Sequence, residues 1–370
     1  MNNRGLEGVV AAETKLSHVD ERGELIIAGY RIDDLAPNAT FEETVWLLWN
    51  GELPDPRELA NFRRELAERR STALTIERPS PLVRGEKVPK ADEGSCTAPL
   101  DAIRMLLPPG DDPLDIVAKF PTIIAAVWRL SRKQEPIAPN PSLGHAANYL
   151  YMLTGEVPSD EKVRALETYL NTVVDHGLNA STFTARVITS TGSDLVSAVV
   201  GGVGALKGPL HGGAPGPALD MVFEIGDASR AEGYLRKKIE AGEKLMGFGH
   251  RVYKVRDPRA DVLAAAAERM FARGGDRSLY ALAGAVEREA LRLLEEYKPG
   301  RRLQTNVEFY TALLLHGIGL EVPLFTPTFA ISRVAGWLAH ALEQRAANRL
   351  IRPQSEYVGP RARTWTAPAA

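Results

Sequence analysis

The sequence predicts an all-α fold with one short N-terminal β-hairpin. Apolar residues recur every third or fourth position through most of the chain after Thr40, which is the spacing of a buried helix face. Glycine and proline separate these segments, and strands do not alternate with them, so a parallel sheet is not expected. The strand-like signal is confined to Leu16 to Tyr30, where two short apolar runs flank the turn-forming Glu21-Arg22-Gly23.

Helices are expected in order along the chain, each ended by a helix breaker. The first carries Phe41, Val45, Leu48 and Trp49 on one face and stops at the GELP sequence that follows. Further segments have the same periodicity: 57–70, 99–107, 113–131, 142–154, 160–174, 193–206, 217–225, 231–241, 260–273, 279–297 and 327–349. Two proline-rich connections, 78–99 and 134–141, indicate long surface loops.

Composition limits the possible classes of protein. With 370 residues, of which 44% are hydrophobic and 25% charged, the chain can form one large domain or two unequal ones. A net charge of -2 gives no electrostatic support for nucleic-acid binding. The single cysteine, Cys96, cannot form an internal disulfide and is typical of a reducing compartment, so we expect the cytoplasm. No stretch reaches membrane-spanning length, and no membrane partner is expected.

The segment from Leu245 to Arg259 is the first candidate site. Gly247 and Gly249 would let the backbone approach a ligand closely. His250 follows them, and an imidazole can donate or accept a proton near neutral pH. A run of cations comes next that could hold phosphates or carboxylates: Arg251, Lys254, Arg256 and Arg259. A solvated loop that ends in a helix cap is an equal alternative for this segment taken alone.

Two more segments contribute candidate proton-transfer groups. His211 lies in the glycine- and proline-rich stretch 207–216, before a helix whose free amides could polarise a bound oxygen, although such a histidine is more often structural. Glu308 lies among apolar residues at the start of a helix. A carboxylate there would have a perturbed proton affinity and could act as a general base, unless it only complements the helix dipole.

The remaining polar candidates favour an anionic ligand. Guanidinium groups bind carboxylates at two points, and several around one pocket would suit a di- or tricarboxylate. The candidates are Arg259, Arg333 and Arg352, with His176 and Asn179 as further donors. Two histidines and a carboxylate also match a non-haem iron site. We expect no metal, because HxxxH, HxE and CxxC spacings do not occur and the arginines would oppose a divalent cation.

In this order the motifs resemble the citrate synthase family, from about Leu6 to Gly359. They read ETKLSHVD, GELIIAGY, FEETVWLLWNGELP, HAANYLYMLTGE, DHGLNAST, GPLHGGA, GFGHRVYK, NVEFY and NRLIRPQSEYVG. The resemblance implies a large helical domain built from residues 1–212 and 320–370, with a small helical domain of residues 213–319 inserted into it. It also implies a homodimer whose domains close over the substrates.

The resemblance further implies a reaction and a role for each candidate. Acetyl-CoA, or propionyl-CoA in a 2-methylcitrate synthase, would condense with oxaloacetate, and hydrolysis of the thioester would release CoA without a bound cofactor. Glu308 would remove the methyl proton, His211 would donate to the thioester oxygen, and His250 would protonate the ketone oxygen. Oxaloacetate would be held by His176, Asn179, Arg259, Arg333 and Arg352 of the partner subunit. CoA would contact Met246, Gly247, Phe248, Gly249, Lys254 and Arg256.

The chain departs from the family pattern at the base position. The family motif is usually NVDFY, and this chain reads NVEFY. Glutamate moves the carboxylate by about 1.5 Å, and a misplacement of that size can cost about a hundredfold in rate. Smaller departures are GGAP in place of GGAN, Gln304-Thr305 in place of Tyr-Pro, and Gln354 in place of a basic residue. A regulatory paralogue that binds CoA and a dicarboxylate but turns over poorly is therefore the alternative.

Overall fold

The computed structural model describes residues 4–6, 8–72, 98–107, 109–208, 211–212, 215–249, 253, 255–272 and 277–365. Helices dominate these residues, and the predicted all-α class is confirmed. They are α1 (Ile32–Asn38), α2 (Phe41–Asn50), α3 (Pro56–Thr72), α4 (Ala98–Leu106), α5 (Pro113–Ser131), α6 (His145–Thr154), α7 (Asp160–Val173), α8 (Ala180–Ser190), α9 (Leu195–Leu206), α10 (Pro215–Ile225), α11 (Ala231–Glu240), α12 (Pro258–Ala272), α13 (Arg277–Tyr297), α14 (Val307–Ile318) and α15 (Phe325–Ala346).

The predicted N-terminal hairpin is present and carries one additional strand. β1 (Ser17–Val19), β2 (Leu25–Ile27) and β3 (Tyr30–Arg31) form an antiparallel sheet in chain order. The turn between β1 and β2 contains Gly23 at φ 89°, a conformation that favours glycine. A Cβ at this position would lie 2.8 Å from Cγ2 of Val255, so the hairpin tip touches the segment that precedes α12.

Two helices were not predicted, and each has a local reason. α1 is short and contains Pro37, so its apolar pattern covers less than two turns. α8 is rich in threonine and serine, and it is started by a cap in which the Asn179 side chain accepts from the amide of Thr182. α6 begins at His145, later than the expected residue 142, because Gly144 occupies the N-cap.

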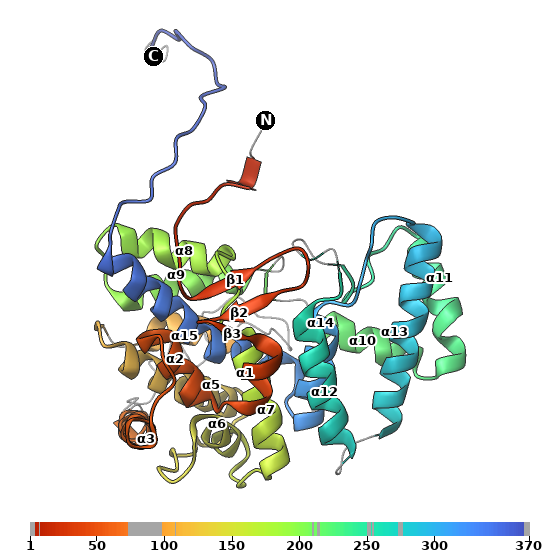
Figure 1. The fold of residues 1–370 in the computed structure, drawn as a ribbon, viewed down its shortest axis with the longest axis horizontal. Coiled ribbons are helices and arrows are strands. Elements are labelled where there is room, and N and C mark those ends of the chain that lie inside the picture. The colour runs from red at the N-terminus through yellow and green to blue at the C-terminus, as the bar shows by residue number, and fades with distance from the viewer. Residues whose placement is uncertain are drawn as a thin grey trace, which may run out of the picture.

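The long helix α15 runs through the interior and organises the fold (Figure 1). It packs against α2, α5, α7, α8 and α9, and its Trp337 side chain is fully buried. α10, α11 and α13 gather at one side of the molecule in Figure 1, where α11 packs on α13 and α10 on α14. α12 joins this group to α1 and α7. The division into an inserted domain of residues 213–319 and a larger domain stays a prediction.

No single described helix is long and apolar enough to cross a membrane. The consecutive helical segments Val307–Ile318 and Val322–Ala346 pass the same test only as a pair, and they are bent by 115°.

α9 packs closely on α15 at Gly202 but not at Gly204, so the same substitution should affect stability differently at these two glycines. A Cβ on Gly202 would lie 2.8 Å from the buried Trp337 ring, whereas a Cβ on Gly204 in the same helix would meet nothing within 4 Å. We expect Gly202→Ala to lower the free energy of unfolding by about 1–3 kcal/mol through overpacking. Gly204→Ala should raise it by about 0.5–1 kcal/mol. Denaturant unfolding measures both, and equal values for the two variants would contradict this packing.

Candidate active site

The glycine-rich loop that ends at Gly249 is paired with the segment that leads into α14. Phe248 and Thr305 form an antiparallel bridge. The amide of Gly249 donates to Gln304 O at 2.7 Å, and the amide of Asn306 donates to Gly247 O at 3.0 Å. Gly247 and Gly249 both have φ 86°, a backbone conformation that favours glycine. Both glycines are therefore required by the shape of this loop. The predicted CoA loop therefore lies beside the predicted base. Its neighbours His250 and Lys254 lie outside the described residues.

Glu308 stands in the first turn of α14, in a position set by the cap of that helix. The side chain of Asn306 accepts from the amide of Glu308 at 2.9 Å and donates to Gly249 O at 2.9 Å. Burial raises the pKa of the Glu308 carboxyl, and the nearby guanidinium of Arg259 partly opposes this. A hydrogen bond with the Asn306 side chain also opposes the shift. This is the environment of a carboxylate with increased basicity.

Arg259 is a buried cation fixed by a carboxylate that the sequence did not suggest. Its Nε and Nη2 donate to Oδ1 and Oδ2 of Asp257 at 3.0 and 2.8 Å. The same carboxylate accepts from the amide of Val307 at 3.2 Å. Asp257 therefore ties the start of α12 to the start of α14, which places Arg259 close to Glu308.

Arg333 is a buried cation that has no acidic partner in the part of the chain that the structure describes. Only 1% of the residue is exposed, and its Nε donates to Val173 O at 2.8 Å. Among the described residues no carboxylate lies within ion-pair distance of its guanidinium. Burial lowers the pKa of Arg333 to about 10, opposed by Asp175 and reinforced by the charge of Arg259. A desolvated cation of this kind is costly unless an anion meets it, so the site favours an anionic ligand.

His176 is brought to this group and meets a residue that was not predicted. Its Nε2 lies 3.0 Å from the hydroxyl of Tyr253, which is 2% exposed. Burial raises the pKa of the Tyr253 phenol, so it remains protonated at neutral pH. The guanidinium of Arg259 lies 5.9 Å from the Tyr253 ring. Tyr253 is part of the GFGHRVYK motif, but only the glycines, the histidine and the cations of this motif were predicted as site residues.

Asn179 and His211 meet at a second group of polar side chains. The side-chain oxygen of Asn179 accepts from the amide of Thr182 at 3.1 Å and so caps α8, while its amide nitrogen donates to Gly177 O and Thr182 Oγ1 at 3.2 and 2.9 Å. Its oxygen lies 2.8 Å from the hydroxyl of Ser181. Nε2 of His211 also lies 2.8 Å from that hydroxyl. Ser181 therefore connects two predicted site residues, although the sequence did not single it out.

The protonation of His211 follows from its surroundings. Burial, together with the charge of Arg333, lowers the pKa of His211 to about 4, so the imidazole is neutral at physiological pH. Ser181 accepts from Trp337 Nε1 at 3.0 Å and has one proton to give, either to Asn179 or to His211. When it donates to Nε2 of His211, the proton of the ring is on Nδ1. This nitrogen is then a neutral donor for a ligand oxygen.

Two predicted residues are not brought to this group. Nη1 of Arg256 donates to Glu287 Oε1 at 2.5 Å, and its Nε pairs with Asp261, so both sides of the guanidinium are engaged. Arg352 is exposed, on the extended segment that leaves the body of the molecule after α15 (Figure 1). Contacts of Arg256 with CoA and of Arg352 with a second subunit stay predictions.

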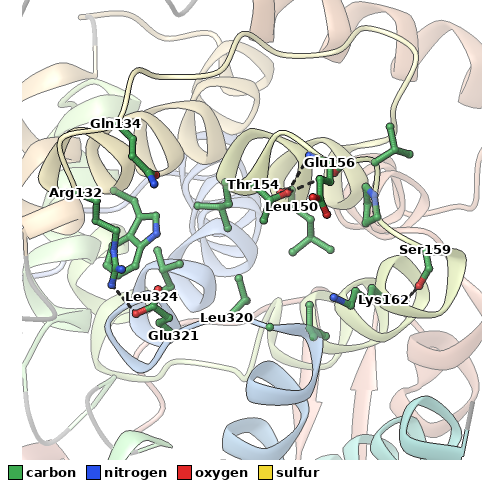
Figure 2. A pocket seen from close by; sticks show the side chains of 16 residues that line it. Arg132, Gln134, Leu150, Thr154, Glu156, Ser159, Lys162, Leu320, Glu321 and Leu324 are labelled. Atoms are coloured by element: carbon green, nitrogen blue, oxygen red, sulfur yellow. Dashed lines mark hydrogen bonds and ion pairs between the residues drawn. The ribbon is translucent and has the colours of Figure 1, made fainter. Parts of the chain in front are cut away.

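A separate cavity lies away from all of these residues. It has a volume of about 440 Å³ and is formed by α5, α6, the start of α7 and the turn between α14 and α15 (Figure 2). Within it Arg132 stacks on Trp128 at 4.1 Å from the ring centroid and pairs with Glu321 at 2.5 Å. None of the predicted site residues lines it, so it is distinct from the candidate active site.

The sequence is similar to known proteins along almost its whole length. The family model described as citrate synthase, C-terminal domain, matches residues 5–354. Citrate synthase 2 of Bacillus subtilis is 40% identical, over 96% of both chains. A 2-methylcitrate synthase of Mycobacterium tuberculosis is also 40% identical, over 96% of this chain and 90% of its own.

Solved structures agree with these relatives. Citrate synthase from Thermotoga maritima has a TM-score of 0.84 and 38% identity, covering 99% of this chain and 98% of its own. The ternary complex of carboxymethyl coenzyme A and oxaloacetate with citrate synthase from Thermoplasma acidophilum has a TM-score of 0.85 and 28% identity, and the match covers 99% of this chain and 98% of that one. The sequence motifs, the helical architecture and the comparisons agree: the chain belongs to the citrate synthase family.

Proposed function

We propose that this protein condenses an acyl-CoA with oxaloacetate and releases CoA by hydrolysis, forming citrate from acetyl-CoA. The observation that carries the proposal is the buried guanidinium of Arg333, which has no carboxylate partner among the described residues and lies near Arg259. A dicarboxylate would supply the missing negative charge. Beside this anion site, burial makes the Glu308 carboxyl more basic and keeps the His211 imidazole neutral, and these are the properties that enolisation requires.

The chemistry follows from these two residues. Glu308, ionised, removes a proton from the methyl group of the thioester, while Nδ1 of neutral His211 donates to the thioester oxygen and stabilises the enolate. The enolate carbon then forms a bond with the ketone carbon of oxaloacetate, and the ketone oxygen takes a proton, a role that we assign to His250. Water cleaves the thioester to give citrate and free CoA. The CoA thioester is a substrate, and no resident cofactor takes part.

The oxaloacetate carboxylates would be held by Arg259, Arg333 and Arg352 of the partner subunit. A homodimer is supported by the extended C-terminal segment, which has large apolar side chains exposed to solvent: Leu350, Tyr357, Val358 and Trp365. A second copy of the chain would cover them. Closure of residues 213–319 over the substrates would exclude water from the enolate. The single cysteine supports the cytoplasm as the compartment.

The choice between acetyl-CoA and propionyl-CoA as the acyl donor can be tested in one assay. Relatives named citrate synthase and 2-methylcitrate synthase are equally similar at 40% identity. A pocket that differs by one methyl group discriminates by about ten- to two-hundredfold. Thiol release with oxaloacetate and either acetyl-CoA or propionyl-CoA should show turnover, with one donor preferred within that range. Stabilisation by the ligands without thiol release would support the regulatory paralogue, which the named relatives do not favour.

Tyr253→Phe tests the oxaloacetate end of the site. The substitution removes only the hydroxyl that lies 3.0 Å from Nε2 of His176. Loss of one such hydrogen bond, about 0.5–1.5 kcal/mol, should raise the KM for oxaloacetate about two- to tenfold. The KM for the acyl-CoA should not change, because the phenol contacts His176, which we assign to oxaloacetate. Equal changes in both KM values would contradict this assignment.

A further inference from the structure

A buried chain of hydrogen bonds runs beneath the turn that carries His176. His340, on α15, and Asp175 are both fully buried. Nδ1 of His340 lies 2.9 Å from Nη1 of Arg186, and its Nε2 lies 3.1 Å from Oδ2 of Asp175. A guanidinium can only donate, so Nδ1 is an acceptor and the ring proton is on Nε2. His340 is therefore neutral and donates to Asp175.

The chain continues on the other side of the turn. Ser17 Oγ donates to Oδ2 of Asp175 at 2.5 Å and accepts from the amide of Gly177 at 2.9 Å. Both residues that flank His176 are thus held, one through its carboxylate and the other through its amide. At the far end, Nη1 of Arg186 also donates to Glu343 at 2.6 Å, which fixes the guanidinium behind His340.

His340 acts at a distance from any ligand. Its side chain is inaccessible, and both ring nitrogens are already used. Arg333, which we assign to the oxaloacetate carboxylates, lies two turns earlier on the same face of α15. The helix therefore supplies one cation to the site and one imidazole to the turn behind it. Removal of that imidazole would leave Asp175 with Ser17 as its remaining hydrogen-bond donor.

We propose that His340 is a positioning residue for oxaloacetate: by holding Asp175 it fixes the 175–177 turn, and so directs His176 toward Tyr253 and the substrate. This inference rests on the proposed function. It assigns no contact with the substrate to His340. Because the acyl-CoA loop lies on different segments, the effect should be confined to the oxaloacetate end of the site.

Two variants of His340 test its two hydrogen bonds separately, the one to Asp175 and the one to Arg186. The amide of glutamine in His340→Gln can reach the place of Nε2 and still donate to Asp175, whereas asparagine in His340→Asn reaches only the place of Nδ1. We expect His340→Asn to raise the KM for oxaloacetate by about tenfold, the lower end of the effect seen when a residue that orients a metal-binding histidine is removed. The KM for the acyl-CoA should change less than about twofold, and His340→Gln should recover most of the loss.

Thr328→Val is the control for a general loss of stability. Thr328 is also fully buried on α15, and its hydroxyl donates to Leu324 O at 2.7 Å. This variant should lower the melting temperature without changing the KM for oxaloacetate. An unchanged oxaloacetate KM in His340→Asn would overturn the inference. Absence of thiol release from the unaltered protein would instead refute the proposed function. Stabilisation by oxaloacetate, compared between that protein and His340→Asn, would then decide the role of His340.

Discussion

Glu308→Gln is expected to lower kcat by a factor of about a hundred to ten thousand, the contribution of a positioned general base. The amide has the shape of the carboxyl group but cannot remove the methyl proton. The buried cations that would hold oxaloacetate, Arg259 and Arg333, remain in place. Thiol release measures the loss of turnover, and the rise in melting temperature on addition of oxaloacetate should stay near the value of the unaltered protein.

The same substitution should change stability in a predictable direction. Burial raises the pKa of Glu308 in the folded state above its value in the unfolded chain. The folded protein therefore binds more protons between these two values, and stability falls as the pH rises through this window. Above this window the buried carboxyl group destabilises the fold, so Glu308→Gln should melt at the same or a higher temperature. A loss of activity then cannot be attributed to unfolding.

Glu295→Gln is the matched control, because Glu295 is exposed on α13 and has no hydrogen bond or ion pair among the described residues. This variant should keep full activity. Near-normal turnover in Glu308→Gln would remove Glu308 as the base. The pH profile adds an independent check: the acid limb of kcat should lie above the ordinary range of a glutamate and should disappear in the Gln variant.

The sequence predicted those parts of the fold that depend on local pattern. Helical periodicity located α5 and α9, and glycine chemistry indicated the bends at 247 and 249. It missed α8, because threonine and serine there give little apolar periodicity and the start is set by a side-chain cap. Such a helix is decided by one hydrogen bond and by packing on α9 and α15, which no window of sequence contains.

Sequence reasoning selected those candidate residues whose type alone indicates a chemical role. His211, Glu308, Arg259 and Arg333 were selected as candidates because imidazoles, acids and guanidinium groups have chemical roles that the residue type alone indicates, and their assignment to the site stays a prediction. Asp257, Tyr253 and Ser181 were missed, since each acts on a residue that only the tertiary fold brings near. The same limit applies to glutamate in NVEFY. Its extra methylene can be judged only against the position of α14, which Asn306 and Asp257 fix.

His211→Gln is expected to lower kcat by about a hundred- to a thousandfold, the cost of one donor to a developing oxyanion. The terminal amide of glutamine can reach the place of Nε2 and retain the contact with Ser181, but it leaves nothing at the place of Nδ1. His211→Asn has the opposite geometry, with an amide near Nδ1 and none near Ser181. If Nδ1 donates to the thioester oxygen, the asparagine variant should be the more active of the two.

The pH dependence distinguishes this role from that of an acid that must be charged. The pKa of His211 is lowered to about 4, so the ring is neutral throughout the range from about pH 5 to 8. Replacement by either amide should therefore reduce kcat by the same factor at every pH in that range. If the imidazolium were the active form, the loss would instead grow as the pH falls toward 5. Greater activity of the glutamine variant would assign catalysis to Nε2 and contradict the arrangement with Ser181.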